Sequence, residues 1–401
     1  MSQSKSPAPA SSTPQPAPFV HPVFEIIQNQ AQDDPDLVAK FFDDPQDVIS
    51  SQVDLEDENG CTALILAAWK GKPRILQFLI DRGIPVNGGN HEHGYTALHF
   101  AALSGNPRVC EILVQNGANP EATNSVKRTP SQMAAFVGNH TCVSIINNFV
   151  PKESVYYFTR KQPLEDEAKL PIKLAKPIHT LVMKMNTHPV SLALHLRSNP
   201  ELLESIEKVV DILERMSNRE FKDRKDVNEV LSLKFHIIYY VLKDIMKQKK
   251  KYDDGPKKNT SFIDLWIKSM LTGRESDGYP VFQEDFLRQG VKEFPYKEAQ
   301  LFKILVSNFS HCQNYGDSIT AAEFINQSFN GQKGFKDKEN CDSCGNEDAP
   351  KKCAKCKSVQ YCDQTCQKLH WFMHKKYCDK LKETHLKQME TISKGAQALQ
   401  S

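Results

Sequence analysis

The sequence predicts a mainly α-helical protein with three parts: a repeat solenoid, a helical segment, and a small finger closed by two metal ions. Three observations predict this architecture. A ten-residue motif begins at Thr62, Thr96 and Thr129, apolar residues follow a helical spacing through the middle, and seven of eleven cysteines fall between Cys341 and Cys378. With 401 residues and 39% hydrophobic content, the chain is long enough for two or three soluble domains.

The first 20 residues are rich in Pro, Ser and Ala and contain no apolar stretch. Such a composition predicts a disordered tail over residues 1–20 rather than a signal peptide. The longest apolar run, His236–Leu242, is far shorter than the roughly 20 residues that span a bilayer, so we expect no direct membrane insertion. A net charge of +2 gives no general reason to expect nucleic acid as a partner. We expect the reducing cytoplasm, with the nucleus as the alternative.

Residues 21–150 carry the repeat. Thr62–Gly71 recurs as Thr96–Gly105 and as Thr129–Gly138, at offsets of 34 and 33 residues. This period and the Thr-Ala-Leu core match ankyrin repeats. The threonine can cap a first helix, the paired alanines let helices approach closely, and the glycine can end the helix. The sequence thus predicts about three ankyrin repeats, with Phe24–Asp54 as a degenerate first unit.

One line of side chains along the repeats is a candidate binding surface. Trp69, Leu103 and Phe136 occupy equivalent positions after the paired alanines, with Tyr95 and Arg128 just before two of the threonines. Aromatic residues and arginine dominate binding hot spots. We expect these residues to contact a protein partner. The alternative is that the same stripe docks onto the segment that follows in the chain.

The middle of the chain reads as a linker followed by helices. Residues 151–175 contain three prolines and mixed charges, and they predict a linker. Residues 176–335 have helical apolar spacing, with helices expected at Ser261–Leu271, Gln283–Val291 and Lys297–Phe309. The sequence contains no phosphate-binding loop, zinc-protease motif, nucleophile elbow or dinucleotide turn. We therefore expect no enzymatic activity.

The cysteine-rich segment has the spacing of metal ligands. Eight residues form the set: Cys341, Cys344, Cys353, Cys356, Cys362, Cys366, His374 and Cys378. A structural zinc takes four such ligands in a tetrahedron, whereas a catalytic zinc keeps one position open. Eight ligands make two closed sites, so the cofactors expected are two structural Zn²⁺ ions in a finger over residues 336–380. Residues 381–401 are expected to form a C-terminal tail.

Three alternatives stay open at this segment. His370 lies four residues before His374 and is a rival ligand. Disulfides would also use the cysteines, although reducing conditions and metal-like spacing disfavour them. Seven lysines surround the ligands and would either compensate thiolate charge or contact nucleic acid: Lys351, Lys352, Lys355, Lys357, Lys368, Lys375 and Lys376.

The pattern resembles the MYND zinc finger. By that resemblance the two sites interleave: Cys341, Cys344, Cys362 and Cys366 hold one ion, and Cys353, Cys356, His374 and Cys378 hold the other. Some MYND fingers bind proline-containing peptides beside a strand and through a Gln and a Trp. The resemblance places these contacts at Gln367 and Trp371, with Ser358–Tyr361 as the strand. The proline-rich N-terminal tail is one candidate ligand, and plain packing of Trp371 is the alternative.

The order of the parts is similar to that of the ankyrin repeat and MYND domain-containing protein 2 family. Three stretches carry the likeness: Met133–Phe149, Lys268–Glu284 and Tyr361–Cys378. The resemblance implies an adaptor in or at the cilium that delivers signalling membrane proteins, notably membrane guanylyl cyclases. Its partners would be these cyclases or ciliary transport proteins.

Two other functions compete with the adaptor. Some SET-type lysine methyltransferases carry MYND fingers, but no cofactor-binding motif of that class flanks the finger here. Many MYND proteins are nuclear corepressor adaptors, which is the main alternative. The lysine-rich run Lys247–Asp254 would suit a nuclear localisation signal, or simply a solvated loop after a helix.

Overall fold

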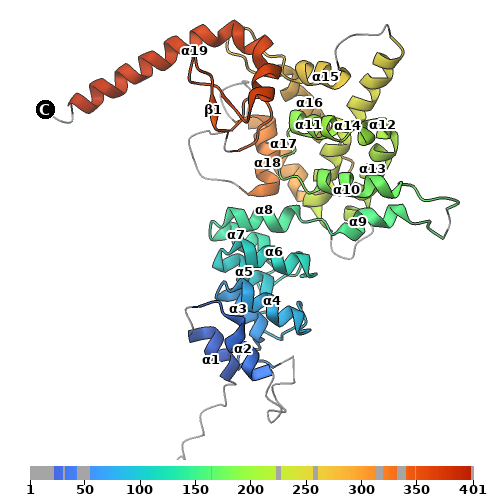
Figure 1. Ribbon diagram of the computed structural model, residues 1–401, viewed down its shortest axis with the longest axis vertical. Helices are drawn as coiled ribbons and strands as arrows, with labels where there is room; N and C mark the ends of the chain where they lie inside the picture. Colours follow the sequence, from blue (N-terminus) through green and yellow to red (C-terminus); the bar gives the residue numbers. More distant parts are fainter. Residues whose placement is uncertain are drawn as a thin grey trace, which may run out of the picture.

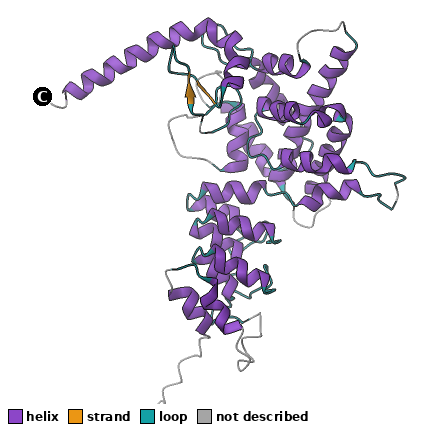
Figure 2. Ribbon diagram, in the orientation of Figure 1, coloured by secondary structure: helices purple, strands orange, loops and turns teal. Residues whose placement is uncertain are grey.

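The computed structural model shows a column of paired helices, a wider helical body, and a finger from which one long helix extends (Figure 1). It describes residues 22–29, 32–42, 55–163, 165–222, 227–255, 261–311, 319–331, 340–347 and 349–398. Helices dominate this part of the chain, and the strands lie in the finger (Figure 2). The mainly α fold is therefore confirmed. The predicted tail over residues 1–20 lies outside the described residues.

The column is the ankyrin array. Its helices are α1 (Pro22–Asn29), α2 (Pro35–Phe42), α3 (Ala63–Trp69), α4 (Pro73–Asp81), α5 (Ala97–Ser104), α6 (Pro107–Gln115), α7 (Pro130–Phe136) and α8 (His140–Asn148). The first helices stack in the order α1, α3, α5, α7, and the second helices stack as α2, α4, α6, α8. The pair α1 and α2 packs like a first unit, although residues 43–54 of the predicted unit are not described.

The motif residues perform the tasks that the sequence predicts. The hydroxyl of Thr62 accepts the backbone N–H of Ile65, and Thr96 and Thr129 make reciprocal caps with the third helical residue. His99 is one of these third residues. Its Nδ1 accepts the N–H of Thr96, so its Nε2 donates to the Arg128 carbonyl 3.0 Å away. His99 thus ties the second repeat to the third.

The glycine that ends α5 shows why the motif closes with this residue. Gly105 has φ +68°, a left-handed conformation that L side chains rarely adopt. A Cβ at Gly105 would also lie 2.7 Å from Oδ1 of Asn139, and the Asn139 amide donates to the carbonyls of Ala102 and Leu103. Asn139 of the third repeat therefore bonds to the end of α5, and only glycine at position 105 leaves space for this contact.

The structure differs from the prediction of a linker over residues 151–175. This segment contains α9 (Lys152–Tyr156), the 3₁₀ helix η1 (Tyr157–Thr159) and the start of α10 (Ile172–Val182). Val155 and Leu174 are fully buried in the core of the helical region. Pro151 and Pro171 are the N-cap residues of α9 and α10, where the missing N–H of proline costs nothing. The prolines start helices here rather than interrupt them.

Eight further helices lie in the described residues between 189 and 330. They are α11 (Pro189–Ser198), α12 (Pro200–Glu204), α13 (Ile206–Lys222), α14 (Glu229–Asp253), α15 (Phe262–Met270), α16 (Val281–Lys292), α17 (Gln300–His311) and α18 (Ala321–Asn330). The three helices predicted between residues 261 and 309 appear as α15, α16 and α17, with bounds shifted by up to three residues. One core forms around α13 and α14, and a second forms among α14, α16, α17 and α18.

The finger consists of an antiparallel pair, β1 (Lys351–Lys352) with β2 (Gln360–Tyr361), followed by α19 (Gln364–Ala398). Val359 and Tyr361 of the finger belong to the same apolar core as Trp266 and Ile267 of α15. The finger is therefore packed into the helical region. The prediction of a C-terminal tail over residues 381–401 differs from the structure, in which α19 continues as helix to Ala398. No helix in the described part of the chain is long and apolar enough to cross a membrane.

Candidate metal centres and binding surfaces

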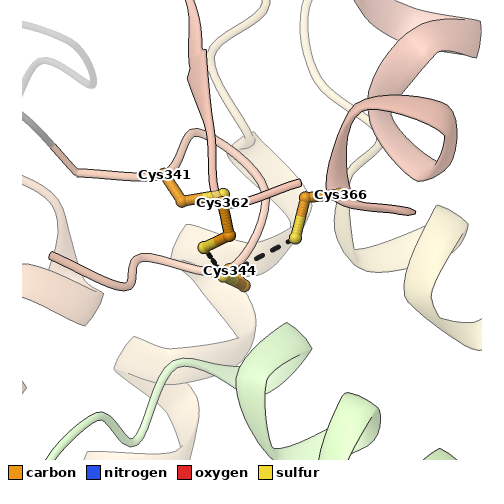
Figure 3. Close-up of side chains that lie close together, drawn as sticks. All are labelled: Cys341, Cys344, Cys362 and Cys366. Carbon is orange, nitrogen blue, oxygen red and sulfur yellow. Dashed lines mark hydrogen bonds between the residues drawn. The ribbon is translucent and has the colours of Figure 1, made fainter. Parts of the chain in front are cut away.

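Four cysteines converge at the first metal centre (Figure 3). Cys341 and Cys344 come from the turn that opens the finger, Cys362 follows β2, and Cys366 lies in the first turn of α19. Their Sγ atoms all lie within 4.8 Å of one another. The Cys344 sulfur is 3.5 Å from that of Cys362 and 3.9 Å from that of Cys366.

The second centre joins Cys353, Cys356, His374 and Cys378, all of them buried. Nε2 of His374 lies 3.4 Å from the Cys353 sulfur and 3.6 Å from the Cys356 sulfur. The sulfurs of Cys353 and Cys378 are 3.9 Å apart. The ligands thus separate into the same two interleaved sets that the MYND resemblance implies.

These distances fit zinc. A tetrahedral ion with Zn–S bonds of about 2.3 Å places its sulfur ligands roughly 3.8 Å apart. The sulfur–sulfur separations of 3.5 and 3.9 Å lie near this value and far above the S–S bond of about 2.05 Å. Four thiols, and three thiols with one imidazole, are the donor sets of structural zinc. The protein holds two structural zinc ions.

His370, the rival ligand, has another role. It lies outside both ligand sets, and its ring is held between two tyrosines, with Nδ1 3.2 Å from the Tyr361 hydroxyl and Nε2 3.0 Å from the Tyr377 hydroxyl. Burial lowers the pKa of His370 to about 4 and raises the pKa of both tyrosines. The neutral imidazole can donate from one nitrogen and accept at the other, which matches two hydroxyl partners.

Local hydrogen bonds aim the ligands of the first centre. The Asp363 carboxylate accepts the Cys366 N–H at 2.9 Å, which caps the start of α19. The Ser343 hydroxyl donates to the Cys366 carbonyl at 2.8 Å. In the turn from Cys341 to Asn346, the Gly345 N–H reaches the Cys341 carbonyl at 2.8 Å. The ligands of the first centre therefore lie in short segments whose conformation is stabilised by hydrogen bonds between nearby residues.

Three residues of the helical region, absent from the predicted set, adjoin the first centre. Burial lowers the pKa of Lys184. The nearby Cys344 thiolate partly offsets this shift by its negative charge. Asn186 donates to the Cys344 carbonyl at 2.8 Å, and the His188 ring presses against Gly345. No local motif marks these residues in the sequence, because their contacts join positions more than 150 residues apart.

Gln367 and Trp371 do lie together. With Gln364 and Lys368 they line a surface groove of about 410 Å³ along α19, in which Trp371 is 44% exposed. A peptide beside the strand expected at Ser358–Tyr361 would need free backbone groups, and those of Gln360 are already bonded. Both the N–H and the carbonyl of Gln360 bond to Asp342, at 2.6 and 3.0 Å, while Val359 bonds to Cys353 on the other side. A peptide could not add to the strand at Gln360.

The stripe on the array is largely accessible. Trp69 is 53% and Phe136 71% exposed, Arg128 is exposed, and Tyr95 and Leu103 are half-buried. The Arg128 guanidinium lies 4.9 Å from the centre of the Phe136 ring. A residue that the prediction missed, Phe100, connects Trp69 and Tyr95, with ring centres 5.4 Å from each. The array meets the helical region mainly through α8, which packs on α18 and α14, and the Asn228 amide also donates to Glu121 of the array at 2.9 Å.

Comparison with known proteins adds three findings. The sequence profile of ankyrin repeats matches residues 29–124 in three copies, and that of the MYND finger matches residues 341–378. Dauer abnormal formation protein 25 of Caenorhabditis elegans is 31% identical over 329 residues, which cover 81% of this chain and 84% of the relative. The chain belongs to the ankyrin repeat and MYND domain-containing protein 2 family.

The stretch Lys268–Glu284, one of the three that resemble the family, contacts the finger. A Cβ at Gly278 would lie 2.2 Å from Cζ of Tyr377, so the loop lies directly against the tyrosine ring. Glu275 in the same loop forms an ion pair of 2.7 Å with Lys376 of α19. The stretch is thus a clasp between the helical region and the finger.

Proposed function

We propose that this chain is a non-enzymatic adaptor that delivers signalling membrane proteins, such as membrane guanylyl cyclases, to the cilium. Its ankyrin repeats and MYND finger are protein-interaction modules, so its partners are proteins. Family membership supports the ciliary role. The name of the nematode relative refers to dauer formation and does not specify a client.

The observation that carries the adaptor reading is the presence of two separate surfaces with exposed aromatic side chains. One is the stripe on the array, with Trp69 and Phe136, and the other is the groove on the finger, with Trp371. Large exposed aromatics are typical anchors of binding hot spots. Two such surfaces on one chain can hold a client and a transport protein together and raise their effective concentration.

The finger groove suits a short proline-containing peptide. The exposed face of Trp371 offers a flat apolar contact, and the amides of Gln364 and Gln367 offer donors and acceptors. Because the Gln360 edge is occupied, recognition would rest on this groove rather than on strand addition. A fluorescent proline-rich peptide should bind the full chain and lose most of its affinity for Trp371→Ala; equal affinity would exclude the groove.

Affinity purification of the full-length protein from ciliated cells tests the proposal. Point variants are preferable to truncation because removal of the finger would open the core that it shares with α15. We expect membrane cyclases or ciliary transport proteins to be recovered. Trp69→Ala with Phe136→Ala should lose one class of partner, and Trp371→Ala the other.

Three outcomes would contradict this assignment. Recovery of chromatin factors through Trp371, together with accumulation in nuclei, would make the nuclear corepressor the better function. Saturable binding of S-adenosylmethionine would revive an enzymatic role. The adaptor would also fail if both variants retained every partner of the unchanged protein.

A further inference from the structure

The ankyrin array, the helical region and the finger meet at one short loop. Residues 183–188, here called the junction loop, connect α10 to α11. Thr187 and His188 of this loop are buried, and Asn186 is half-buried. Side-chain amides from the loop, the finger and α18 make a connected set of hydrogen bonds here.

On one side the junction loop grips the first metal centre. Asn186 donates both amide hydrogens to the finger, one to the Cys344 carbonyl at 2.8 Å and one to Oδ1 of Asn346 at 2.6 Å. A Cβ at Gly345 would lie 3.0 Å from Cδ2 of His188, so the His188 ring lies directly beside the turn. The turn that presents two zinc ligands is thus positioned directly by Asn186.

On the other side the same loop holds α18. Oδ1 of Asn186 accepts the His188 N–H at 2.9 Å and the Asn326 amide at 3.3 Å. Asn326 in turn accepts the N–H and the hydroxyl of Thr187, at 3.0 and 2.8 Å. Both donors of the Asn186 amide and its oxygen are therefore engaged, and any displacement of the finger turn leaves polar groups without partners.

The last step runs from α18 to the array. The Asn330 amide donates to the Met185 carbonyl at 3.0 Å. Oδ1 of Asn330 accepts the Ser144 hydroxyl at 2.9 Å and the Asn148 amide at 2.8 Å, both from α8. The junction loop therefore bonds to the zinc ligand Cys344 through Asn186, and it is linked to α8, the last helix of the array, through Asn330.

We propose that the zinc ion at Cys341, Cys344, Cys362 and Cys366 fixes the docking of the ankyrin array, with Asn186 as the coupling residue. The ion holds the turn from Cys341 to Asn346 in place, and this turn positions the Asn186 side chain. The junction loop then places Met185 and Thr187 where they bond to α18. Metal occupancy at the finger then controls how the stripe and the groove lie relative to each other. This inference does not depend on the identity of the client.

Hydrogen exchange of the full-length protein tests the coupling. Backbone amides of α8 and α18 are compared in the zinc-loaded protein and after removal of zinc by a chelator. We expect these amides to exchange about tenfold faster without zinc, which corresponds to about 1.4 kcal/mol. Unchanged protection of α8 and α18 after zinc removal would overturn the proposal.

Asn186→Ala separates coupling from metal binding. This variant keeps all eight ligands, so it should retain two zinc ions per chain while α8 and α18 already exchange about tenfold faster. Asn199→Ala is the matched control, because among the described contacts the Asn199 side-chain amide donates only to the His195 carbonyl of the preceding helix α11. Chelation could also speed hydrogen exchange in α13 and α14, which would indicate general unfolding. In that case the test rests on the zinc-loaded Asn186→Ala protein, and normal protection of α8 in this variant would overturn the coupling.

Discussion

At the residue scale, Lys234 is a charged side chain in an apolar environment. It lies in α14, fully buried, and its Nζ has no hydrogen-bond partner in the described part of the chain. Burial alone lowers the pKa of Lys234 to about 7. A buried ammonium without a partner costs folding free energy, so Lys234 opposes the stability of the helical region near neutral pH.

Lys234→Met should stabilise the protein and change how its stability depends on pH. Between pH 7 and the ordinary lysine pKa of 10.5, the unfolded chain binds more protons than the folded chain, so the free energy of unfolding rises with pH. Methionine removes this slope and should add about 2–4 kcal/mol near pH 7. Denaturant unfolding at pH 7 and pH 9.5 measures both effects; an unchanged slope would show that Lys234 is paired.

His370 and Cys353 are both buried in the finger but should respond differently to substitution. Cys353→Ser removes a ligand, so zinc content should fall from two ions per chain to one, while the array helices α3 to α6 keep their protection from exchange. His370→Gln is the control: it leaves both ligand sets intact and should keep two ions. Elemental analysis decides, and two ions bound to the Cys353→Ser protein would contradict the ligand set.

At the element scale, the first helices of the repeats divide their side chains between two tasks. Ala67 and Ala101 are fully buried where neighbouring helices touch, while Trp69 and Phe136 project from the ends of α3 and α7. Stacking therefore depends on the small residues and on Phe100, which is only 8% exposed. Trp69 adds one ring contact with Phe100, with 5.4 Å between the ring centres, and Phe136 is 71% exposed, so both aromatics contribute little to this buried packing.

Trp69→Ala combined with Phe136→Ala should weaken partner binding while leaving the thermal midpoint within about 2 °C. Phe100→Ala provides the contrast, because its buried ring should cost about 3–5 kcal/mol of stability. Differential scanning fluorimetry of the three proteins is the measurement. Early melting of the Trp69 and Phe136 variant would mean that the stripe packs internally.

At the scale of the whole molecule, the finger is fastened to the helical region at two places. The clasp lies against α19 through Gly278 and Glu275, and the junction loop holds the opposite end of the finger through Asn186. Between them, finger and helical side chains share one apolar core. The two parts should therefore unfold together rather than one after the other.

Gly278→Ala should break the clasp. The added methyl group would overlap the Tyr377 ring, and φ at Gly278 is +76°, so we expect a loss of about 2–4 kcal/mol and faster proteolysis within α19. Gly83→Ala is the matched control, because Gly83 also has positive φ but no atom within 4 Å of the added carbon. It should cost only about 1 kcal/mol. Equal effects of the two variants would show that the contact with Tyr377 is unimportant.

How far the sequence predicts this molecule depends on the range of each signal. The zinc ligands and the threonine caps lie in short segments that repeat recognisable spacings, so the sequence suffices for both. The prediction of a linker over residues 151–175 is wrong, because a proline that caps a helix cannot be told in the sequence from one that breaks a helix. Asn186 gives no signal, because its partners are distant in sequence and amides pair without a characteristic spacing.

The core shared by α15 and the finger has a consequence for synthesis on the ribosome. Repeats contact only their neighbours, so the ankyrin array can fold as it emerges. The helical region cannot complete its core until Tyr361 and Leu369 of the finger have been synthesised. During most of translation it therefore exposes apolar surface, and a nascent chain in this state is a substrate for chaperones. A stop codon ahead of the finger would leave a folded ankyrin array joined to a helical region with an incomplete core.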